Sequence, residues 1–256
     1  MHEGDTVMRF LDKTHDIKTS YGGGFVDSID GLQGHKAAQH DWFYFVNGIE
    51  ASKGAADFGL SPGDRVQWDY RDWRAAMRVP AIVGAYPEPM KSGSEGKRLP
   101  VRVQCENPGG QPCRDVMKRL GDAGVIASAA ALQGQAGDRS VRVLVGRWPA
   151  LRQDRGAAAI ERGPRASGVF ARFSGGSLQL LDGAGQVKEV APAGTGLVAA
   201  TDNESSGIVW VVTGLDDAAV ARAAQALDER KLRAAYALAE TPSASVRLPV
   251  VAVATP

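Results

Sequence analysis

The stretch at residues 41–51, "DWFYFVNGIEA", restricts the possible folds of this chain most strongly. Its four consecutive aromatic residues, Trp42–Phe45, are of the types that favour β-strands. Asn47-Gly48, which follows them, is a strong signal for a two-residue hairpin turn. The sequence therefore predicts an aromatic strand that ends in a tight turn.

One helix and two further strands are expected around this aromatic strand. Residues 5–15 have apolar residues at helical spacing after Asp5, a possible N-cap, and predict a short helix. Residues 25–32 and 60–73 alternate between apolar and polar types, which is typical of half-buried strands. The first part of the chain is thus predicted to be a small α+β unit of one helix and three strands.

Aromatic residues are concentrated in this first part and predict a domain boundary. Of the 17 aromatic residues, 11 lie between Tyr21 and Tyr86, whereas the later two-thirds is rich in Ala, Gly, Arg and Val. Between the two parts lies a Pro/Gly/Ser/Lys stretch without periodicity, which is typical of a linker. We predict one domain at residues 1–86, a linker at 87–98 and a mixed α/β domain of unknown role at 99–256.

The second part alternates strands and helices. Helices are expected at 113–124, 151–163 and 216–238, the last as one long helix capped by Asp216 or Asp217. Strands are expected at residues 99–105, 141–148, 168–173, 177–182, 196–202 and 207–215. This order predicts a mixed sheet and gives the whole chain an α+β fold class.

Charge, hydropathy and cysteine content exclude several classes of protein. The formal net charge is +1, which gives no indication of a nucleic-acid or anionic-membrane partner. No apolar run approaches the roughly 18 residues of a membrane span, and no signal peptide follows Met1. Cys105 and Cys113 close a short loop, so they form either a disulfide, which implies an oxidising compartment, or two unlinked thiols.

An ordered set of motifs in residues 5–75 resembles a bacterial surface-protein domain. The set comprises Tyr21-Gly22 with residues 29–32, "WFYFVNG", Gly54-Ala55 and "PGD" followed by Trp68. That domain is similar to the C-terminal β-domain of the vitamin B12 carriers transcobalamin and intrinsic factor, which belongs with soluble-ligand-binding β-grasp folds.

The resemblance implies a β-grasp-like first domain, a location outside the cytoplasm and a corrinoid such as cobalamin as ligand. In the carriers, this domain closes over one face of the corrin ring. Family members have one more strand, and a secretion signal, before the helix that begins here near residue 5. We therefore expect that the natural protein is exported and starts upstream of Met1.

The glycine run in "SYGGGFVDSI" allows two interpretations. Because it does not join a strand to a helix, it does not fit a phosphate-binding loop. It is either a turn or bulge that leads into the strand at 25–32, or a bare backbone edge that a flat ligand or a peptide strand can approach.

The aromatic side chains are the second candidate feature. Alternation along the strand places Trp42 and Tyr44 on one face and Phe43 and Phe45 on the other. We expect the two phenylalanines in the core and the other pair nearer to solvent, because its rings have polar tips. The predicted ligand-binding residues are Tyr21, Gly22, Gly23, Gly24, Phe25, Trp42, Tyr44, Trp68 and Tyr70.

Catalytic chemistry is not indicated. Asp41, Asp64, Asp69 and Asp72 with Arg71 could supply an acid–base pair, but such residues are more often turn residues and a solvated strand edge. The sequence has no nucleophile elbow, nucleotide-binding loop or zinc spacing. We therefore predict a non-catalytic extracytoplasmic binding protein for a small flat ligand without a resident metal or cofactor; the alternative is a cell-surface protein–protein interaction module.

Overall fold

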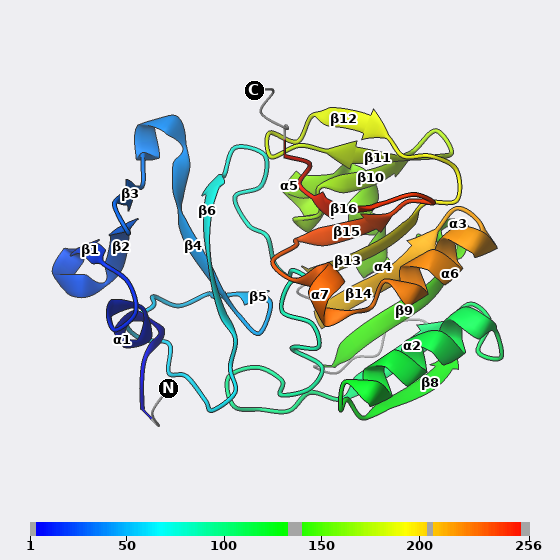
Figure 1. Cartoon of the computed structure of the whole chain (residues 1–256), viewed down its shortest axis with the longest axis horizontal. Coiled ribbons are helices and arrows are strands. Elements are labelled where there is room, and N and C mark those ends of the chain that lie inside the picture. Colours follow the sequence, from blue (N-terminus) through cyan, green and yellow to red (C-terminus); the bar gives the residue numbers. More distant parts are fainter. Residues whose placement is uncertain (1–3, 133–139, 204–206, 252–256) are drawn as a thin grey trace.

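The computed structural model describes residues 4–132, 140–203 and 207–251 of the chain, and it contains both helices and sheets (Figure 1). The fold class is therefore α+β, as predicted. The helices of the described residues, with single 3-10 turns labelled η, are α1 (Val7–Asp12), η1 (Tyr21–Gly23), η2 (Lys36–Ala38), α2 (Gln111–Asp122), α3 (Trp148–Leu151), α4 (Arg155–Ala158), η3 (Ala159–Arg162), α5 (Pro164–Ser167), α6 (Asp217–Gln225) and α7 (Glu229–Leu232). Their strands are β1 (Ile17–Ser20), β2 (Phe25–Ile29), β3 (Leu32–Gln33), β4 (His40–Val46), β5 (Ile49–Glu50), β6 (Val66–Asp72), β7 (Val101–Cys105), β8 (Ala127–Ala131), β9 (Val141–Arg147), β10 (Ala171–Ser174), β11 (Ser177–Leu181), β12 (Val187–Val190), β13 (Gly196–Asn203), β14 (Gly207–Gly214), β15 (Ala237–Glu240) and β16 (Ser245–Leu248).

The first 72 residues form α1 and two three-stranded sheets, with strand orders β1-β2-β3 and β5-β4-β6. The aromatic strand is β4, and Asn47-Gly48 connects it to β5 with positive φ at both residues, as the hairpin prediction requires. Thr6 caps α1 in place of the predicted Asp5: its Oγ1 accepts a hydrogen bond from the amide of Arg9 at 3.2 Å. The Asp5 carboxylate instead pairs with Lys13 Nζ at 2.7 Å.

The rest of the chain is built on a seven-stranded sheet with the order β16-β15-β13-β14-β9-β7-β8. Strands β8, β7, β9 and β14 are parallel to one another, whereas β13, β15 and β16 join by antiparallel pairing. Helices α2 and α6 cover one face, and the segments α3 to α5 with the small sheet β10-β11-β12 lie on the other (Figure 1).

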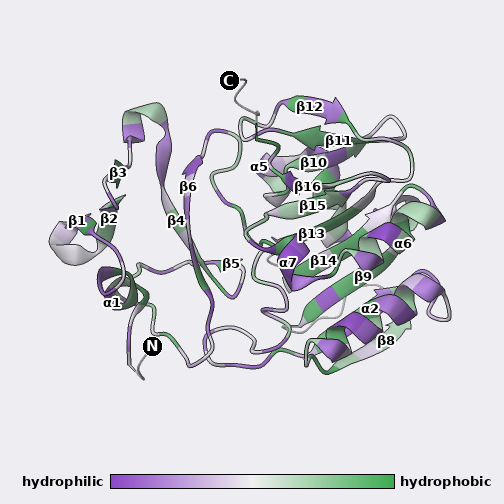
Figure 2. Cartoon of the chain, viewed as in Figure 1, coloured by the Kyte–Doolittle hydropathy of each residue, from purple (hydrophilic) through white to green (hydrophobic). Residues whose placement is uncertain are grey.

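Both faces of the central strands are buried, which explains their nearly continuous apolar sequence. In β14, Trp210 and Val212 pack towards α2 and α6, whereas Val209 and Val211 pack towards the opposite layer. Figure 2 shows β9 and β14 largely in the hydrophobic colour and α2 with a mixture of both colours, as expected for a strand pair inside and a helix outside.

The predicted linker at 87–98 does not behave as a free connection over its first residues. Glu88 and Met90 are buried, and Met90 belongs to the core cluster on the α2 side of the sheet. Upstream of them, Ile82 packs with Phe45 of β4 in the cluster on the opposite side. The stretch therefore contributes packing to the sheet. Its composition concealed this because the apolar residues are interspersed with prolines and lysines.

The predicted long helix at 216–238 is wrong in its second half. The chain forms α6 and then the single-turn α7, and residues from Ala237 onward enter the sheet as β15. Asp228 interrupts the helix because its carboxylate accepts hydrogen bonds from the amides of Arg230 and Lys231 and starts a new helix. The predicted helix at 151–163 is likewise divided into short segments. Asp154 lies within this range and caps the N-terminus of α4, so a new helix begins there.

Candidate functional site

An aromatic cavity lies inside the first 72 residues, between β2, β4, β6 and the loop that follows β5. Its volume is about 220 Å³. We call this the aromatic cavity, and its lining residues are Gly24, Phe25, Val26, Trp42, Phe43, Tyr44, Glu50, Ala51, Lys53, Gly54, Ala55 and Trp68.

Strand register brings the aromatic rings together. Trp42 and Tyr44 lie on the same face of β4, and their antiparallel partners on β6 are Tyr70 and Trp68. The rings of Tyr44 and Trp68 have centroids 5.1 Å apart, and those of Trp42 and Tyr70 are 5.2 Å apart. Four aromatic side chains thus form one continuous surface across two strands.

The face of β4 that was expected nearer to solvent is covered. Tyr44 is buried among residues of α1 and the loop around Phe58, and Trp42 is half-buried beside β2. On the other face Phe45 is fully buried, as expected for core, while Phe43 is half-buried with the Arg71 guanidinium 3.8 Å from its ring centroid. The polar tips of Trp42 and Tyr44 do not bring these rings to the surface because each tip bonds a backbone carbonyl.

Those two hydrogen bonds fix the rings at the cavity. Trp42 Nε1 donates to the carbonyl of Leu32 at 3.0 Å, and the Tyr44 hydroxyl donates to the carbonyl of Lys53 at 2.7 Å. Burial is the main cause that raises the pKa of Tyr44, with the charges of Asp57 and Glu95 adding to it. The Tyr44 hydroxyl therefore keeps its proton at neutral pH and holds the loop after β5 against the ring.

Trp68 contributes a polar atom without a partner. Among the described residues, its indole Nε1 is buried and makes no hydrogen bond. A buried N–H that lacks an acceptor is unfavourable by about 1–3 kcal/mol.

The glycine run is a turn that reaches the cavity with its last residue only. Tyr21–Gly23 form η1, which joins β1 to β2, and Gly22 and Gly23 have positive φ. Gly24 lines the cavity opposite Gly54: a Cβ on Gly54 would lie 3.7 Å from the Gly24 carbonyl oxygen. The turn interpretation thus describes the run, and of its three glycines only Gly24 lines the cavity.

Five of the nine predicted ligand-binding residues meet at the aromatic cavity, namely Gly24, Phe25, Trp42, Tyr44 and Trp68. The other four lie beside it or away from it. Tyr21 is 83% exposed on the turn, next to Gly22 and Gly23. Tyr70 packs against Trp42 with its ring tilted by 55°, and its hydroxyl donates to the carbonyl of Gln33 at 3.1 Å.

The cavity also has a wall that the prediction missed. Residues 51–55 follow the hairpin and run back beside β4, and the amide of Ala51 donates to the carbonyl of Tyr44 at 3.1 Å. Lys53 brings a cation to this wall and pairs with Glu95 at 2.9 Å. The hairpin signal at Asn47-Gly48 could have located this wall, because a tight turn returns the chain past the strand that it leaves.

The carboxylates of the first part are structural and not a solvated edge. Asp69 and Arg71 are largely buried together with Glu50: Arg71 pairs with Glu50 at 2.5 Å and with Asp69 at 3.0 Å. The hydroxyl of Tyr236, from just before β15, donates to Asp69. Burial raises the pKa of Glu50 and of Asp69, and the positive charge of Arg71 opposes this effect. The group connects β6 to the seven-stranded sheet.

The remaining three aspartates serve local structure. Asp41 Oδ1 accepts from its neighbour's amide at 2.9 Å, and Asp64 Oδ2 accepts from the amide of Ser61 at 2.8 Å. Asp72 binds the side chain of Arg74, and this hydrogen bond lowers the pKa of Asp72. None of them lines the aromatic cavity.

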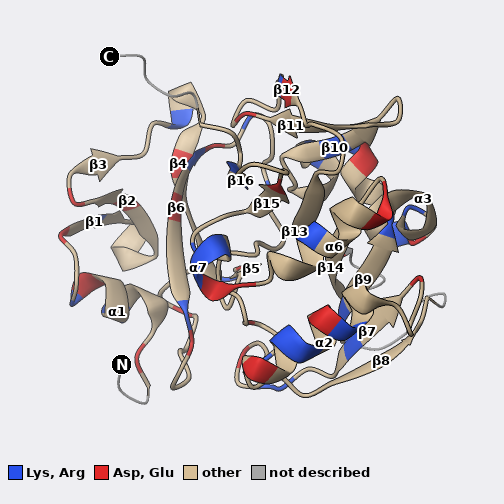
Figure 3. Ribbon diagram, turned by 45° about the vertical axis from the view of Figure 1, so that its right-hand side comes forward, with Lys and Arg blue, Asp and Glu red and all other residues tan. Residues whose placement is uncertain are grey.

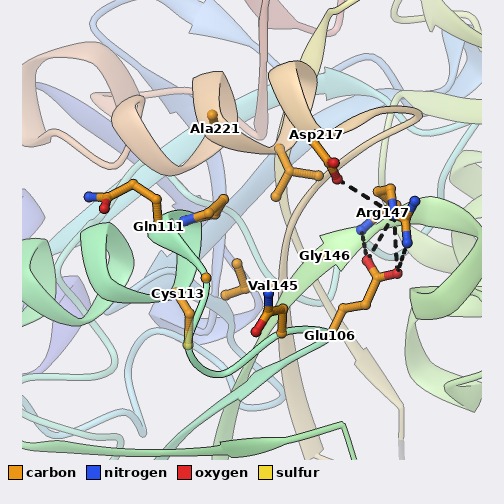
Figure 4. Close-up of a pocket in the computed structure, with 12 residues that line it drawn as sticks. Glu106, Gln111, Cys113, Val145, Gly146, Arg147, Asp217 and Ala221 are labelled. Atoms are coloured by element: carbon orange, nitrogen blue, oxygen red, sulfur yellow. Dashed lines mark hydrogen bonds and ion pairs between the residues drawn. The ribbon is translucent and has the colours of Figure 1, made fainter.

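A second cavity, of about 370 Å³, lies at the carboxyl edge of the parallel strands β7 and β9 (Figure 4). We call it the edge cavity. Cys113 lines it and is joined by a disulfide to Cys105 at the end of β7, with Cα atoms 6.0 Å apart. Arg147 at the end of β9 binds Glu106 at 2.6 Å and lies 3.6 Å from Asp217 at the start of α6.

The charged groups of the edge cavity satisfy one another. The hydrogen bond from Arg147 lowers the pKa of Glu106, and Gly146 admits this pair because a Cβ there would lie 2.6 Å from Glu106 Cβ. Ligands of open parallel sheets commonly bind at this edge. The sequence did not predict this cavity, since β7 and β9 become neighbours only through sheet order.

The comparison with protein families found that residues 4–72 match a family described as a domain of unknown function (DUF4430). The comparison with curated proteins found no match. The matched segment contains every residue that lines the aromatic cavity.

The described residues contain neither a membrane-spanning helix nor a metal-binding cluster. No helix there is both long and apolar enough to span a membrane. No cluster of three or more His, Cys, Asp or Glu side chains in the same ranges is arranged to hold a metal ion.

Proposed function

We propose that this chain is a non-catalytic binding protein for a small flat ligand, which inserts into the aromatic cavity. The observation that supports this function is the convergence of Phe25, Trp42, Tyr44 and Trp68 on one concave site. Concave, mainly apolar sites with a few polar groups are the usual binding places of small molecules. Here the charged residues of the lining are Glu50 and Lys53, and Trp68 adds an indole Nε1 that is buried without a partner among the described residues.

The cavity volume limits what can be enclosed. An apolar cavity of about 150 Å³ is known to hold a benzene molecule, and the aromatic cavity measures about 220 Å³. One or two fused rings therefore fit inside it, stacked against indole and phenol rings. A larger flat molecule would insert an edge and lie partly outside.

We further propose that residues 4–72 form a transcobalamin-C-terminal-like, β-grasp unit, and that a corrinoid is a candidate ligand. Support comes from the ordered motifs, which surround the cavity in the structure: Trp42, Gly54, Ala55 and Trp68 all line it. Because a corrin ring exceeds the cavity, cobalamin would contact this chain through one edge or through its flat nucleotide base.

The disulfide supports a location outside the cytoplasm. Disulfides persist in oxidising compartments and are rare in the cytosol, and Cys105 and Cys113 are joined in this structure. A secreted or cell-surface protein that captures a small ligand agrees with this bond.

A second candidate function is docking of a partner protein by the sheet β1-β2-β3. It is favoured by Tyr21 and Leu32, which are 83% and 48% exposed. These residues lie outside the aromatic cavity, so the two candidates predict sensitivity at different positions.

The test is a titration of the full chain with benzimidazole, cobinamide and cobalamin, followed by isothermal calorimetry and by tryptophan fluorescence. Binding of benzimidazole, or of a corrinoid, with quenching is expected. Two matched variants each add a leucine side chain. Gly54→Leu places it at the cavity wall, where a Cβ makes only ordinary contacts. Gly59→Leu places it outside the cavity, where a Cβ has no neighbour within 4 Å.

Loss of binding in Gly54→Leu with retention in Gly59→Leu would support the proposal. Absence of binding by all three compounds at about 1 mM would reject the small-ligand function. Equal weakening by the two leucine variants would show that the compounds bind elsewhere.

A further inference from the structure

A third cavity, of about 450 Å³, lies between the segment after β6 and the layer that contains α5, β10 and β11. We call it the arginine cavity. Its lining residues are Arg74, Ala75, Arg162, Gly163, Pro164, Arg165, Arg172, Leu181, Ala184, Gly185 and Gln186. It shares no residue with the aromatic cavity or the edge cavity.

Four arginines and no carboxylate line this cavity, in a chain whose formal net charge is only +1. The arginines come from four different elements, so no single run of basic sequence explains their meeting. Figures 1 and 3 show β10, which contains Arg172, in the layer on the far side of the sheet from α2. The concentration of positive charge is therefore a property of the fold.

Most of the four guanidinium groups have N–H donors that make no hydrogen bond within the described chain. Arg162 makes no hydrogen bond or ion pair with any part of the chain that the structure describes, and Arg165 makes one long hydrogen bond of 3.5 Å, to the carbonyl of Arg74. Arg172 uses one nitrogen to bind Gln179 at 2.7 Å. Only Arg74 is neutralised, by Asp72. Three guanidinium groups thus face the cavity without a counter-charge on its wall.

The cavity is held in shape by close packing at its base. Gly185, with positive φ, lies in the turn after β11, where a Cβ would be 3.3 Å from Ala75 Cβ and 3.4 Å from Pro164 Cγ. The Asp182 carboxylate is occupied within the same turn, since it accepts from the amides of Ala184 and Gln186 at 3.0 Å. The turn therefore closes one side of the cavity, and Asp182 itself is not among the lining residues.

We infer that the arginine cavity binds an anion with at least two phosphate groups. Arginine presents a planar fork of donors that matches phosphate oxygens, and its charge persists at every physiological pH. Three guanidinium groups without a carboxylate partner offer more donors and more positive charge than one orthophosphate needs. The volume of about 450 Å³ accommodates a diphosphate with an attached group. The shared chemistry is the diphosphate, from either an inorganic or a nucleotide source.

The arginine cavity differs from the aromatic cavity in its chemistry, so each proposal can be tested independently of the other. Flat neutral compounds such as benzimidazole test the aromatic cavity, whereas pyrophosphate tests the arginine cavity. Binding of both at once is allowed, because the two linings have no residue in common.

The experiment is isothermal calorimetry of the full chain at low ionic strength with pyrophosphate, orthophosphate and ADP. Pyrophosphate is expected to bind more tightly than orthophosphate, and the affinity should fall as salt is added. ADP that binds as tightly as pyrophosphate indicates recognition of the diphosphate alone, and tighter binding of ADP indicates an added contact to the nucleoside; both support the site.

The variants are Arg162→Gln and Arg165→Gln, both at exposed side chains, so the fold should be retained. Each should weaken pyrophosphate about tenfold, because a hydrogen bond to a charged group is lost. Arg233→Gln, at an exposed arginine outside the cavity, is the matched control and should leave the affinity unchanged.

Three outcomes would overturn the inference. These are no binding of pyrophosphate at about 1 mM, equal affinity for orthophosphate and pyrophosphate, and equal weakening by Arg233→Gln and the two cavity variants. The last result would assign binding to the general positive charge of the chain.

Discussion

Residues 4–72 and the seven-stranded sheet use their apolar side chains in different ways. In the sheet, strands such as β9 and β14 bury nearly every residue, and the apolar side chains are mostly small valines and alanines packed on both faces. In residues 4–72 two small clusters combine aliphatic side chains with aromatic rings, and several of the rings, such as Trp42 and Trp68, are only half-buried around a cavity. The difference supports the proposal that the sheet supplies stability and that the aromatic part binds the ligand.

The largest effect is expected from a charge pair inside the sheet layer. Arg142 of β9 is fully buried and binds both oxygens of Asp154, at 2.6 and 2.9 Å. Asp154→Ala would leave this charge without its carboxylate and should lower the free energy of unfolding by about 3–5 kcal/mol. Denaturant unfolding measures the change; a loss below about 1 kcal/mol would contradict the assignment of stability to this layer.

A smaller loss in the free energy of unfolding is expected where residues 4–72 pack against the seven-stranded sheet. Phe45 of β4 is fully buried in the same cluster as residues of the sheet, and its ring centroid lies 6.2 Å from that of Tyr236. Phe45→Ala should therefore cost about 3 kcal/mol and shift a single unfolding transition. Two separate transitions, seen by fluorescence and circular dichroism, would show instead that the regions unfold independently.

The disulfide should contribute to the stability of the chain and not to ligand binding. It closes a loop with a sequence separation of 8, for which the chain-entropy model gives a stabilisation of about 2.5 kcal/mol. The double variant Cys105→Ala/Cys113→Ala should lose this amount in thermal or denaturant unfolding. Binding at the aromatic cavity should be unchanged, and a parallel loss of binding would break the proposed division of roles.

Opposite pH dependences should separate the two regions. Burial raises the pKa of Asp69, so the folded protein binds its proton more tightly than the unfolded chain, and this stabilisation is lost as pH rises above about 4. The pKa of Glu106 is lowered by its hydrogen bond to Arg147, so its contribution is present above the unfolded value and is lost as pH falls.

The measurement is the free energy of unfolding between pH 3 and pH 8 for Asp69→Asn and Glu106→Gln. Relative to the wild-type chain, Asp69→Asn should gain stability with rising pH and Glu106→Gln should lose it. The same slope in both variants would contradict the two environments.

The sequence allowed prediction of the elements that have strong local signals. The aromatic strand β4, the Asn47-Gly48 turn and helix α2 depend on residue type and spacing within short segments. Five residues of the aromatic cavity were predictable because strand alternation and the ordered motifs fix which side chains share a face.

Features that depend on distant contacts could not be predicted. Tyr236 reaches Asp69 across 167 positions of sequence, and this contact turns a seemingly solvated Asp-Arg edge into a buried network. The covering of Tyr44 by α1, the edge cavity and the meeting of the four arginines likewise require the tertiary arrangement. Composition misled at Asp228, where an N-cap ends one helix and begins another.

The central claim is that a flat ligand enters the aromatic cavity, and the indole N–H signals of the tryptophans test it most directly. In a ¹H–¹⁵N nuclear magnetic resonance spectrum, assigned with Trp68→Phe and Trp42→Phe, benzimidazole should shift the signals of Trp42 and Trp68. The signals of Trp148 and Trp210, both buried in the sheet region, should stay in place. Shifts confined to Trp148 and Trp210, or no shift at saturating benzimidazole, would contradict the account.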